Sequence, residues 1–113
     1  MKSYPMLNKY EIMWMMVLFD LPVIEKQERK DASGFRNFLL DNGFAMVQYS
    51  IYIRVFSGSD ACEKYFKLIE EHLPDKGKVD ILTITDRQYE CIKSYSCRSP
   101  HHRKKQSDQL LMF

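Results

Sequence analysis

The chain has 113 residues, 45% of them hydrophobic and 13% aromatic, which excludes a disordered protein and is enough for one domain with its own core. The formal net charge is only +2, from 17 basic and 15 acidic residues, so overall charge gives no argument for nucleic-acid binding. Three cysteines without CxxC spacing argue against a disulfide-stabilised secreted protein and favour a reducing, cytoplasmic location, but the sequence gives no role to Cys62, Cys91 or Cys97.

The first predicted element is a strand over about residues 11–19. Ile12 to Phe19 form an uninterrupted apolar run that stops at Asp20-Leu21-Pro22. A short apolar run bounded by a turn signal is typical of a strand buried on both faces. The run is far shorter than the roughly 20 residues of a membrane-spanning helix, so we expect no membrane segment. Asp20 then lies at the rim of the sheet, where its carboxylate can reach solvent, a metal ion or a phosphate.

A helix is predicted over about residues 24–41, because apolar side chains recur on one of its faces: Ala32, Phe35, Phe38 and Leu39. Asn42-Gly43 supplies the residues that a left-handed C-terminal cap prefers. Two strands follow, over 44–49 and 50–56. In the second strand, one face is expected to be buried and the other more polar, with Ile51, Ile53 and Val55 alternating with Ser50, Tyr52 and Arg54.

A second helix is predicted to start near Asp60, with Asp60 and Glu63 as a capping-box pair, because apolar residues again share a face: Cys62, Tyr65, Phe66, Ile69 and Leu73. A strand over 79–85 comes next, and residues 86–95 are interpreted as a short turn or strand. The order strand, helix, strand, strand, helix, strand predicts an α+β protein with the ferredoxin-like βαββαβ fold.

The predicted domain covers residues 1–95. Residues 96–107 are polar and basic and contain Pro100, so we interpret them as a flexible linker. The last residues, 108–113, end in four apolar side chains, which are costly to leave in water. We expect them to form an extra C-terminal strand that docks on the edge of a sheet.

The fold predicts a homodimer that forms through the sheet face. Both helices of a ferredoxin-like domain pack on one face of the sheet, yet the first strand is apolar on both. Each large side chain that is buried contributes roughly 1.5–3 kcal/mol, so an uncovered face would forgo several such increments. Packing against a second copy about a two-fold axis buries it. The alternative is a long loop folded over the sheet.

Asp20 is the candidate catalytic and metal-binding residue. A hard divalent ion such as Mg2+, or Mn2+ in its place, is held by one or two carboxylates together with water and phosphate oxygens. Two Asp20 residues near the dimer axis could form such a site, where the ion could polarise a phosphodiester and activate water. The alternative is structural, because an aspartate before Leu-Pro often caps a turn through its own side chain.

Basic residues are the candidate nucleic-acid contacts. One group lies near the first helix and the sheet: Arg29, Lys30, Arg36 and Arg54. On the helix, interleaved acidic residues leave open the alternative of a solvated surface. The second group lies in the tail and has no acidic neighbours: Arg98, Arg103, Lys104 and Lys105. No recognised zinc pattern, glycine-rich phosphate loop or nucleophile elbow accompanies them.

Several stretches, in their order and spacing, resemble one protein family. They are Val17-Leu18-Phe19-Asp20, then residues 35–44, residues 47–54 and residues 81–89. The chain is similar over about residues 11–95 to the small CRISPR-associated protein of the adaptation module, the ferredoxin-like partner of the CRISPR integrase. The end of the first helix and the terminal residues 109–113 look most like members found beside type II effector systems.

The resemblance implies a homodimer with Asp20 as its metal-binding aspartate and a metal-dependent endoribonuclease or endonuclease activity. It also implies a scaffold in spacer acquisition, where the dimer bridges two integrase dimers and binds double-stranded DNA. Phe19 departs from the family, since many members carry Tyr before the aspartate. An alternative is a single-stranded RNA-binding module of the same fold without catalysis. Such modules carry a glycine-aromatic motif, and residues 50–54 lack that glycine.

Overall fold

The computed structural model describes residues 11–97 of the chain. The predicted docking strand 108–113, the predicted linker beyond Cys97 and the four basic tail residues lie outside the described residues. The elements follow in the order β1 (Met13–Asp20), α1 (Lys26–Asp41), β2 (Ala45–Gln48), β3 (Ile51–Phe56), α2 (Ser59–Glu70), β4 (Lys78–Thr85) and α3 (Asp86–Glu90). The predicted βαββαβ order is confirmed, with α3 as an addition.

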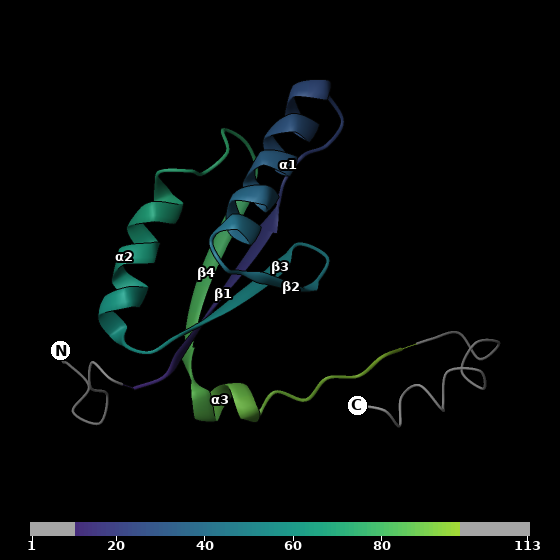
Figure 1. Ribbon diagram of the computed structural model, residues 1–113. Helices are drawn as coiled ribbons and strands as arrows, with labels where there is room; N and C mark the ends of the chain where they lie inside the picture. The colour runs from purple at the N-terminus through teal and green to yellow at the C-terminus, as the bar shows by residue number, and fades with distance from the viewer. Residues whose placement is uncertain (1–10, 98–113) are drawn as a thin grey trace.

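The strands form one antiparallel sheet in the order β2-β3-β1-β4, which is the strand order of the ferredoxin-like fold. α1 and α2 lie side by side over one face of this sheet, while α3 lies at the end where β1 begins (Figure 1). Strand β1 is central and pairs with β3 on one side and β4 on the other. The side chains on the two faces of β1 therefore lie at the centre of the two faces of the sheet.

The core lies between the helices and the sheet. Alternate residues of β1 point toward the helices, and Met15 and Val17 are completely buried there. Phe19 packs edge-on against Phe35 of α1, with ring centroids 5.3 Å apart. The same cluster includes Leu39 of α1 and Ile69 of α2, both fully buried. The helical stripes predicted from the sequence therefore form one continuous core with β1.

The opposite side of the sheet, which we call the open face, is apolar and partly exposed. The strand register brings together on it Trp14, Met16 and Leu18 of β1, Ile51, Ile53 and Val55 of β3, and Asp80, Leu82 and Ile84 of β4. Val55 and Leu82 keep 46% and 50% of their surface exposed. The predicted bare sheet face therefore exists within the described residues.

The expected assignment of buried and polar faces in β3 was only partly right: Ile53 is buried as expected, at 5% exposed, but Tyr52 and Val55 differ from the expectation. Tyr52 is only 2% exposed, because it points toward the helices and its ring stacks with that of Phe19, the ring centroids being 5.6 Å apart. Val55, expected on the buried side, lies on the open face and is half-exposed. Alternation shows that a strand has two faces, but not which of them the helices cover. An aromatic ring with a polar tip can occupy the core side just as well as an aliphatic residue.

The helix ends follow the sequence only in part. α1 ends at Asn42-Gly43 as predicted, where Gly43 has φ +86° and the Asn42 amide donates to the Phe38 carbonyl at 2.8 Å. The expected capping box of α2 is wrong, since Gly58 occupies the N-cap position and no side chain bonds there. A capping box does form at α3, where the Gln88 backbone N–H donates to Thr85 Oγ1 at 3.1 Å.

Helix α3 is anchored to the open face by the single tryptophan. The Trp14 indole N–H donates to Asp86 Oδ1 at 2.8 Å. The Trp14 and Tyr89 rings stack with centroids 3.9 Å apart and planes 12° from parallel. Residues 86–90 are therefore a helix rather than the turn or strand considered from the sequence, and they cover the end of the open face that lies farthest from Asp20.

Gly34 in the middle of α1 provides a test of how far helix propensity limits this fold. A Cβ at this position would meet no atom within 4 Å. We expect Gly34→Ala to raise the free energy of unfolding by about 0.5–1 kcal/mol, because alanine loses less backbone entropy in a helix. Urea unfolding followed by circular dichroism measures this change. A decrease in stability would mean that α1 needs a glycine at position 34.

Candidate functional site

Asp20 is the last residue of β1 and is exposed to solvent. Its backbone partner on β4 is Lys78, and the next pair along, Leu18 with Asp80, lies on the same face. On the β3 side, the Phe19 backbone N–H donates to the Ser50 carbonyl at 3.1 Å. The central strand is thus held from both neighbours up to its last residues, which places the Asp20 carboxylate at the rim of the open face.

A shallow hollow surrounds this carboxylate. It measures about 320 Å³ and is lined by Leu18, Phe19, Asp20, Tyr49, Ser50, Ile51, Lys78 and Asp80. Lys78 Nζ lies 3.7 Å from Asp80 Oδ2, so these two side chains form a surface ion pair. Among residues 11–97, the Asp20 carboxylate accepts no hydrogen bond and joins no ion pair. The alternative role as a turn cap therefore has no support in the described part of the chain.

The hollow offers carboxylate ligands that suit a hard metal ion, but too few of them to form a complete site. Carboxylate oxygens are the ligands that Mg2+ and Mn2+ prefer, and Mg2+ keeps several waters and binds substrate phosphates as well. Across the described part of the chain, no group of three or more His, Cys, Asp or Glu side chains is gathered for a metal. One copy offers Asp20, with Asp80 nearby but paired to Lys78. The donor set fits an ion that takes its other ligands from water, phosphate or a second copy.

Asp80 was not singled out from the sequence. It lies inside the strand predicted over 79–85, and only the pairing of Leu18 with Asp80 brings it to the hollow of Asp20. The one signal in the sequence is that charged residues interrupt the start of this strand on alternate positions, at Lys78 and Asp80. Alternation of this kind indicates that the two side chains share a face of the strand, but only the pairing with β1 shows which residues lie beside them.

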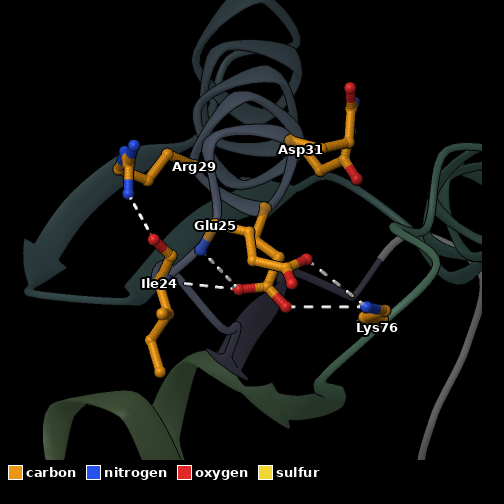
Figure 2. A network of polar contacts seen from close by, with 7 residues as sticks. Ile24, Glu25, Arg29, Asp31 and Lys76 are labelled. Carbon is orange, nitrogen blue, oxygen red and sulfur yellow. Dashed lines mark hydrogen bonds and ion pairs between the residues drawn. The ribbon is translucent and has the colours of Figure 1, made fainter.

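The chain that leaves Asp20 is fixed by Glu28 in the first turn of α1. Glu28 Oε1 accepts from the backbone N–H groups of Ile24, at 3.1 Å, and Glu25, at 2.9 Å. Glu28 Oε2 lies 3.6 Å from Lys76 Nζ, and Glu25 Oε1 lies 3.9 Å from the same nitrogen (Figure 2). The hydrogen bond from the Glu25 backbone, and then that from Ile24 and the Lys76 ammonium, hold the pKa of Glu28 below its usual value despite partial desolvation.

Three of the predicted basic contacts within the described residues lie on α1, and the fourth, Arg54, lies on β3. Arg29 donates to the carbonyls of Val23 and Ile24, at 3.3 and 2.6 Å, while Lys30 is exposed on the same turn of α1. Arg36, two turns further, donates to Ser33 Oγ at 3.3 Å. Arg29 and Arg36 therefore each make hydrogen bonds within the chain, while no hydrogen bond or ion pair of Lys30 is found within residues 11–97.

Arg54 has different surroundings. Its guanidinium lies 4.6 Å from the ring centre of Phe56 and 4.4 Å from that of Tyr65, and it donates to the Asn42 carbonyl at 2.8 Å. These contacts tie β3 to α2 and to the end of α1. Arg54 therefore stabilises the helix-covered side of the sheet in this structure, and the nucleic-acid surface proposed below does not depend on it.

A second, larger groove occupies the open face. It measures about 1060 Å³ and runs between the sheet and the segment that contains α3 and the residues after it. Its walls are mostly aliphatic and aromatic, including Met16, Ile53, Leu82, Ile84, Tyr89 and Tyr95. Tyr95 keeps 80% of its surface exposed. The groove is an extended apolar surface rather than an enclosed catalytic pocket.

The three cysteines contribute nothing to either hollow that the structure shows. Cys62 is buried in the core, and this burial, together with the nearby Glu63 charge, raises the pKa of its thiol. Cys91 and Cys97 are exposed free thiols in the segment after α3. No helix within residues 11–97 has the length and apolar character needed to cross a membrane.

The protein is an α+β protein of the ferredoxin-like class, with helices α1 and α2 over one face of its sheet and Asp20 at the end of the central strand. Within that class, a family model described as "CRISPR associated protein Cas2" matches residues 13–92. The chain therefore belongs to the Cas2 family of CRISPR-associated proteins, which confirms the resemblance drawn from the sequence.

Relatives from three bacteria agree with this assignment. A Paracidovorax avenae protein named CRISPR-associated endoribonuclease Cas2 is 47% identical over 108 residues, covering 96% of this chain and 100% of its own length. One of the same name from Flavobacterium psychrophilum is 42% identical over 112 residues, covering 99% and 97%. One from Streptococcus mutans is 36% identical over 77 residues, covering 68% and 71%.

The lowered pKa of Glu28 predicts a pH dependence of stability. A carboxyl whose pKa is lower in the folded than in the unfolded state adds stability above its unfolded pKa, and this stability is lost as the pH falls through the folded value. We therefore expect Glu28→Gln to lose less stability than the parent chain between about pH 5 and about pH 3. Urea unfolding across this range measures it, with Glu70→Gln on α2 as a control for charge removal. An equal loss of stability in Glu28→Gln and in the parent chain would contradict the prediction.

Proposed function

We propose that this chain is a CRISPR spacer-acquisition subunit that works in the cytoplasm as a homodimer joined through its open faces. The observation that carries the proposal is the combination of an apolar open face with Asp20 at its rim, where no residue of the range 11–97 pairs with the carboxylate. Met16, Leu82 and Val55 form the kind of exposed apolar surface that marks a protein interface. A second copy packed on the open face would bring a second Asp20 carboxylate toward a common axis.

The dimer would supply what one copy lacks for metal binding. Asp20 from each copy would hold one Mg2+ or Mn2+ ion, and Asp80 lines the same hollow. Such an ion, when bound, neutralises phosphodiester charge and lowers the pKa of its bound water. The part of this chain is to hold the carboxylates at the rim and to leave the hollow open to a phosphate. This supports metal-dependent cleavage of RNA or DNA, and the relatives named endoribonucleases favour RNA.

The second role proposed is that of a scaffold. Family membership in the CRISPR system supports a dimer that bridges two integrase dimers on double-stranded DNA. Exposed Lys30 and the basic tail residues Arg98, Arg103, Lys104 and Lys105 are the candidate phosphate contacts, with Arg29 and Arg36 in support. This role needs two-fold symmetry and phosphate binding but no active site.

The alternative of a single-stranded RNA-binding module receives little support. Such modules stack bases on aromatic rings exposed on the sheet. The aromatic ring that the open face takes from β1 is that of Trp14, and Tyr89 already stacks on it at 3.9 Å. The neighbouring positions on this face are aliphatic, as at Met16, Leu82 and Ile84.

Dimerisation is tested by placing a charge on the open face. Leu82 is 50% exposed there, and Leu40 is 49% exposed on α1, so the two make a matched pair. We expect Leu82→Lys to shift the protein from dimer to monomer in sedimentation velocity, because an unpaired ammonium cannot be buried cheaply. Leu40→Lys should remain dimeric. A parent chain that is already monomeric at high micromolar concentration would overturn the proposed dimer.

The catalytic role of Asp20 is tested by Asp20→Asn, which keeps the side-chain shape and removes the charge. We expect the rate of metal-dependent RNA cleavage to fall by about 100-fold or more, the scale for loss of a group that stabilises developing charge. Asp41→Asn, at the exposed end of α1, is the control and should cleave at the parent rate. No cleavage by the parent chain with Mg2+ or Mn2+ at any pH would end the nuclease proposal.

The scaffold role makes a separate prediction for the same variant. If the chain acts as a scaffold, Asp20→Asn should still co-purify with the integrase and still support spacer acquisition in cells, because bridging needs no metal chemistry. Loss of acquisition with the integrase complex intact would assign acquisition to the Asp20 site. Failure of the parent chain to bind the integrase would remove the scaffold role.

A further inference from the structure

Asp20 ends a strand, so the direction of its carboxylate depends on what holds the chain just beyond it. Residues 21–25, between β1 and α1, belong to neither element. The position of a carboxylate at such a junction is only as well defined as the backbone of the junction, which depends on the contacts that restrain it. Two sets of contacts restrain it, and both involve the loop that precedes β4.

The first contact is made by Gly77. A Cβ built on Gly77 would lie 2.7 Å from the Asp20 carbonyl oxygen, 2.8 Å from Leu21 Cδ2 and 3.0 Å from Leu21 Cα. Gly77 also has φ +101°, a conformation that other residues rarely adopt. The absence of a side chain therefore allows the loop backbone to lie directly against the backbone of Asp20 and Leu21.

The second contact fixes the neighbour of Gly77. Lys76 Nζ lies 3.6 Å from Glu28 Oε2, and the Glu28 side chain is only 14% exposed. The alternative partner of Lys76 is Glu25, at 3.9 Å and with a side chain that is 69% exposed. Lys76 is 65% exposed in both pairs, and Glu28 is the nearer and less exposed of its two partners. The Glu28 carboxylate therefore links Lys76 on one side to the backbone N–H groups of Ile24 and Glu25 on the other.

The space enclosed by these segments is nearly filled. The cavity between Leu21, Pro22, Glu28, Asp31, Ala32, Pro74 and Lys76 measures only about 10 Å³. This is at the lower limit for a single water molecule, so the segments lie close together here. Glu28 thus joins both ends of the junction: its Oε1 holds residues 24 and 25, and its Oε2 holds the loop whose next residue touches Asp20.

We infer that Glu28, Lys76 and Gly77 form a clamp that positions Asp20 for metal binding. This inference rests on the metal-binding role proposed for Asp20. The three are positioning residues, since they act on Asp20 through the backbone and through each other. Within the described residues, the Asp20 carboxylate has no hydrogen bond of its own that could orient it, so the clamp adds to the pairing of Asp20 with Lys78 in fixing the backbone that carries it. Loosening the clamp should move Asp20 without removing any ligand.

The test measures Mn2+ binding by NMR on the full chain, because Mn2+ broadens the signals of nuclei close to it. We expect Mn2+ to broaden the side-chain carboxyl signal of Asp20 in the parent chain. Gly77→Ala should shift the Asp20 signals and weaken Mn2+ affinity by about 10-fold or more, as is usual for loss of a group that supports a ligand. Gly34→Ala is the matched control and should change neither, because its Cβ meets no atom within 4 Å.

Gly77→Ala adds backbone strain and can fail to fold, so two further variants are needed. Glu28→Gln keeps an oxygen for the backbone N–H groups of residues 24 and 25 but loses the ion pair, and Lys76→Met loses it from the other side. Both should shift the Asp20 signals and weaken Mn2+ affinity in the same direction. Glu25→Gln should have little effect. A lower melting temperature alone would be the mark of a merely structural role.

The outcomes separate this inference from the proposed function. If Mn2+ leaves the Asp20 signal of the parent chain unchanged, the metal-binding role of Asp20 fails. The clamp is then judged by whether the Asp20 signals move in Glu28→Gln and Lys76→Met. If the parent chain binds Mn2+ at Asp20 and these variants bind it equally well, with unshifted Asp20 signals, the clamp is wrong and the function stands.

Discussion

The constraint on which this structure depends is that two helices cover only one face of a sheet whose central strand is apolar on both. On the covered side, Met15 and Val17 are completely buried in the core. On the open face, Leu82 and Val55 remain about half exposed beside Met16. Burial of apolar area is the main favourable term in folding and in association, so one face stabilises the fold and the other drives the proposed dimer. Helix α3 covers part of the open face, through Trp14, at the end away from Asp20.

The position of the candidate site follows from the central place of β1. A strand at the edge of the sheet would end next to one neighbour, whereas β1 ends between the hairpin before β3 and the start of β4. Its last residue therefore enters a hollow that also contains Tyr49 and Asp80. The same arrangement brings the loop before β4 against the backbone of Asp20, where Gly77 leaves space for it. The strand pairing that forms the sheet also places these groups around the Asp20 carboxylate, so the fold determines the site.

Several charged residues of the described part of the chain make contacts within it. Glu28 and Lys76 connect α1 to the loop before β4, and Arg54 connects β3 to α2 through two aromatic rings. Arginine suits such a place because its flat, weakly hydrated guanidinium stacks on rings while it still donates hydrogen bonds. The net charge of +2 is therefore a poor guide to the proposed nucleic-acid surface. In the proposed assembly, that surface combines α1 of two copies with the basic tail.

The sequence by itself determined the order of the elements, the strand ending at Asp20, the helix ending at Asn42-Gly43 and the presence of a bare apolar sheet face, because these depend on local periodicity and turn chemistry. Only the tertiary structure decided that Tyr52 rather than Val55 faces the helices, that residues 86–90 form a helix held by Trp14, and that Arg54 is engaged with Phe56 and Tyr65. Only it placed Asp80 and Gly77 beside Asp20. These facts depend on strand register and on contacts between segments far apart in the chain, and a single sequence does not encode such contacts in its local pattern.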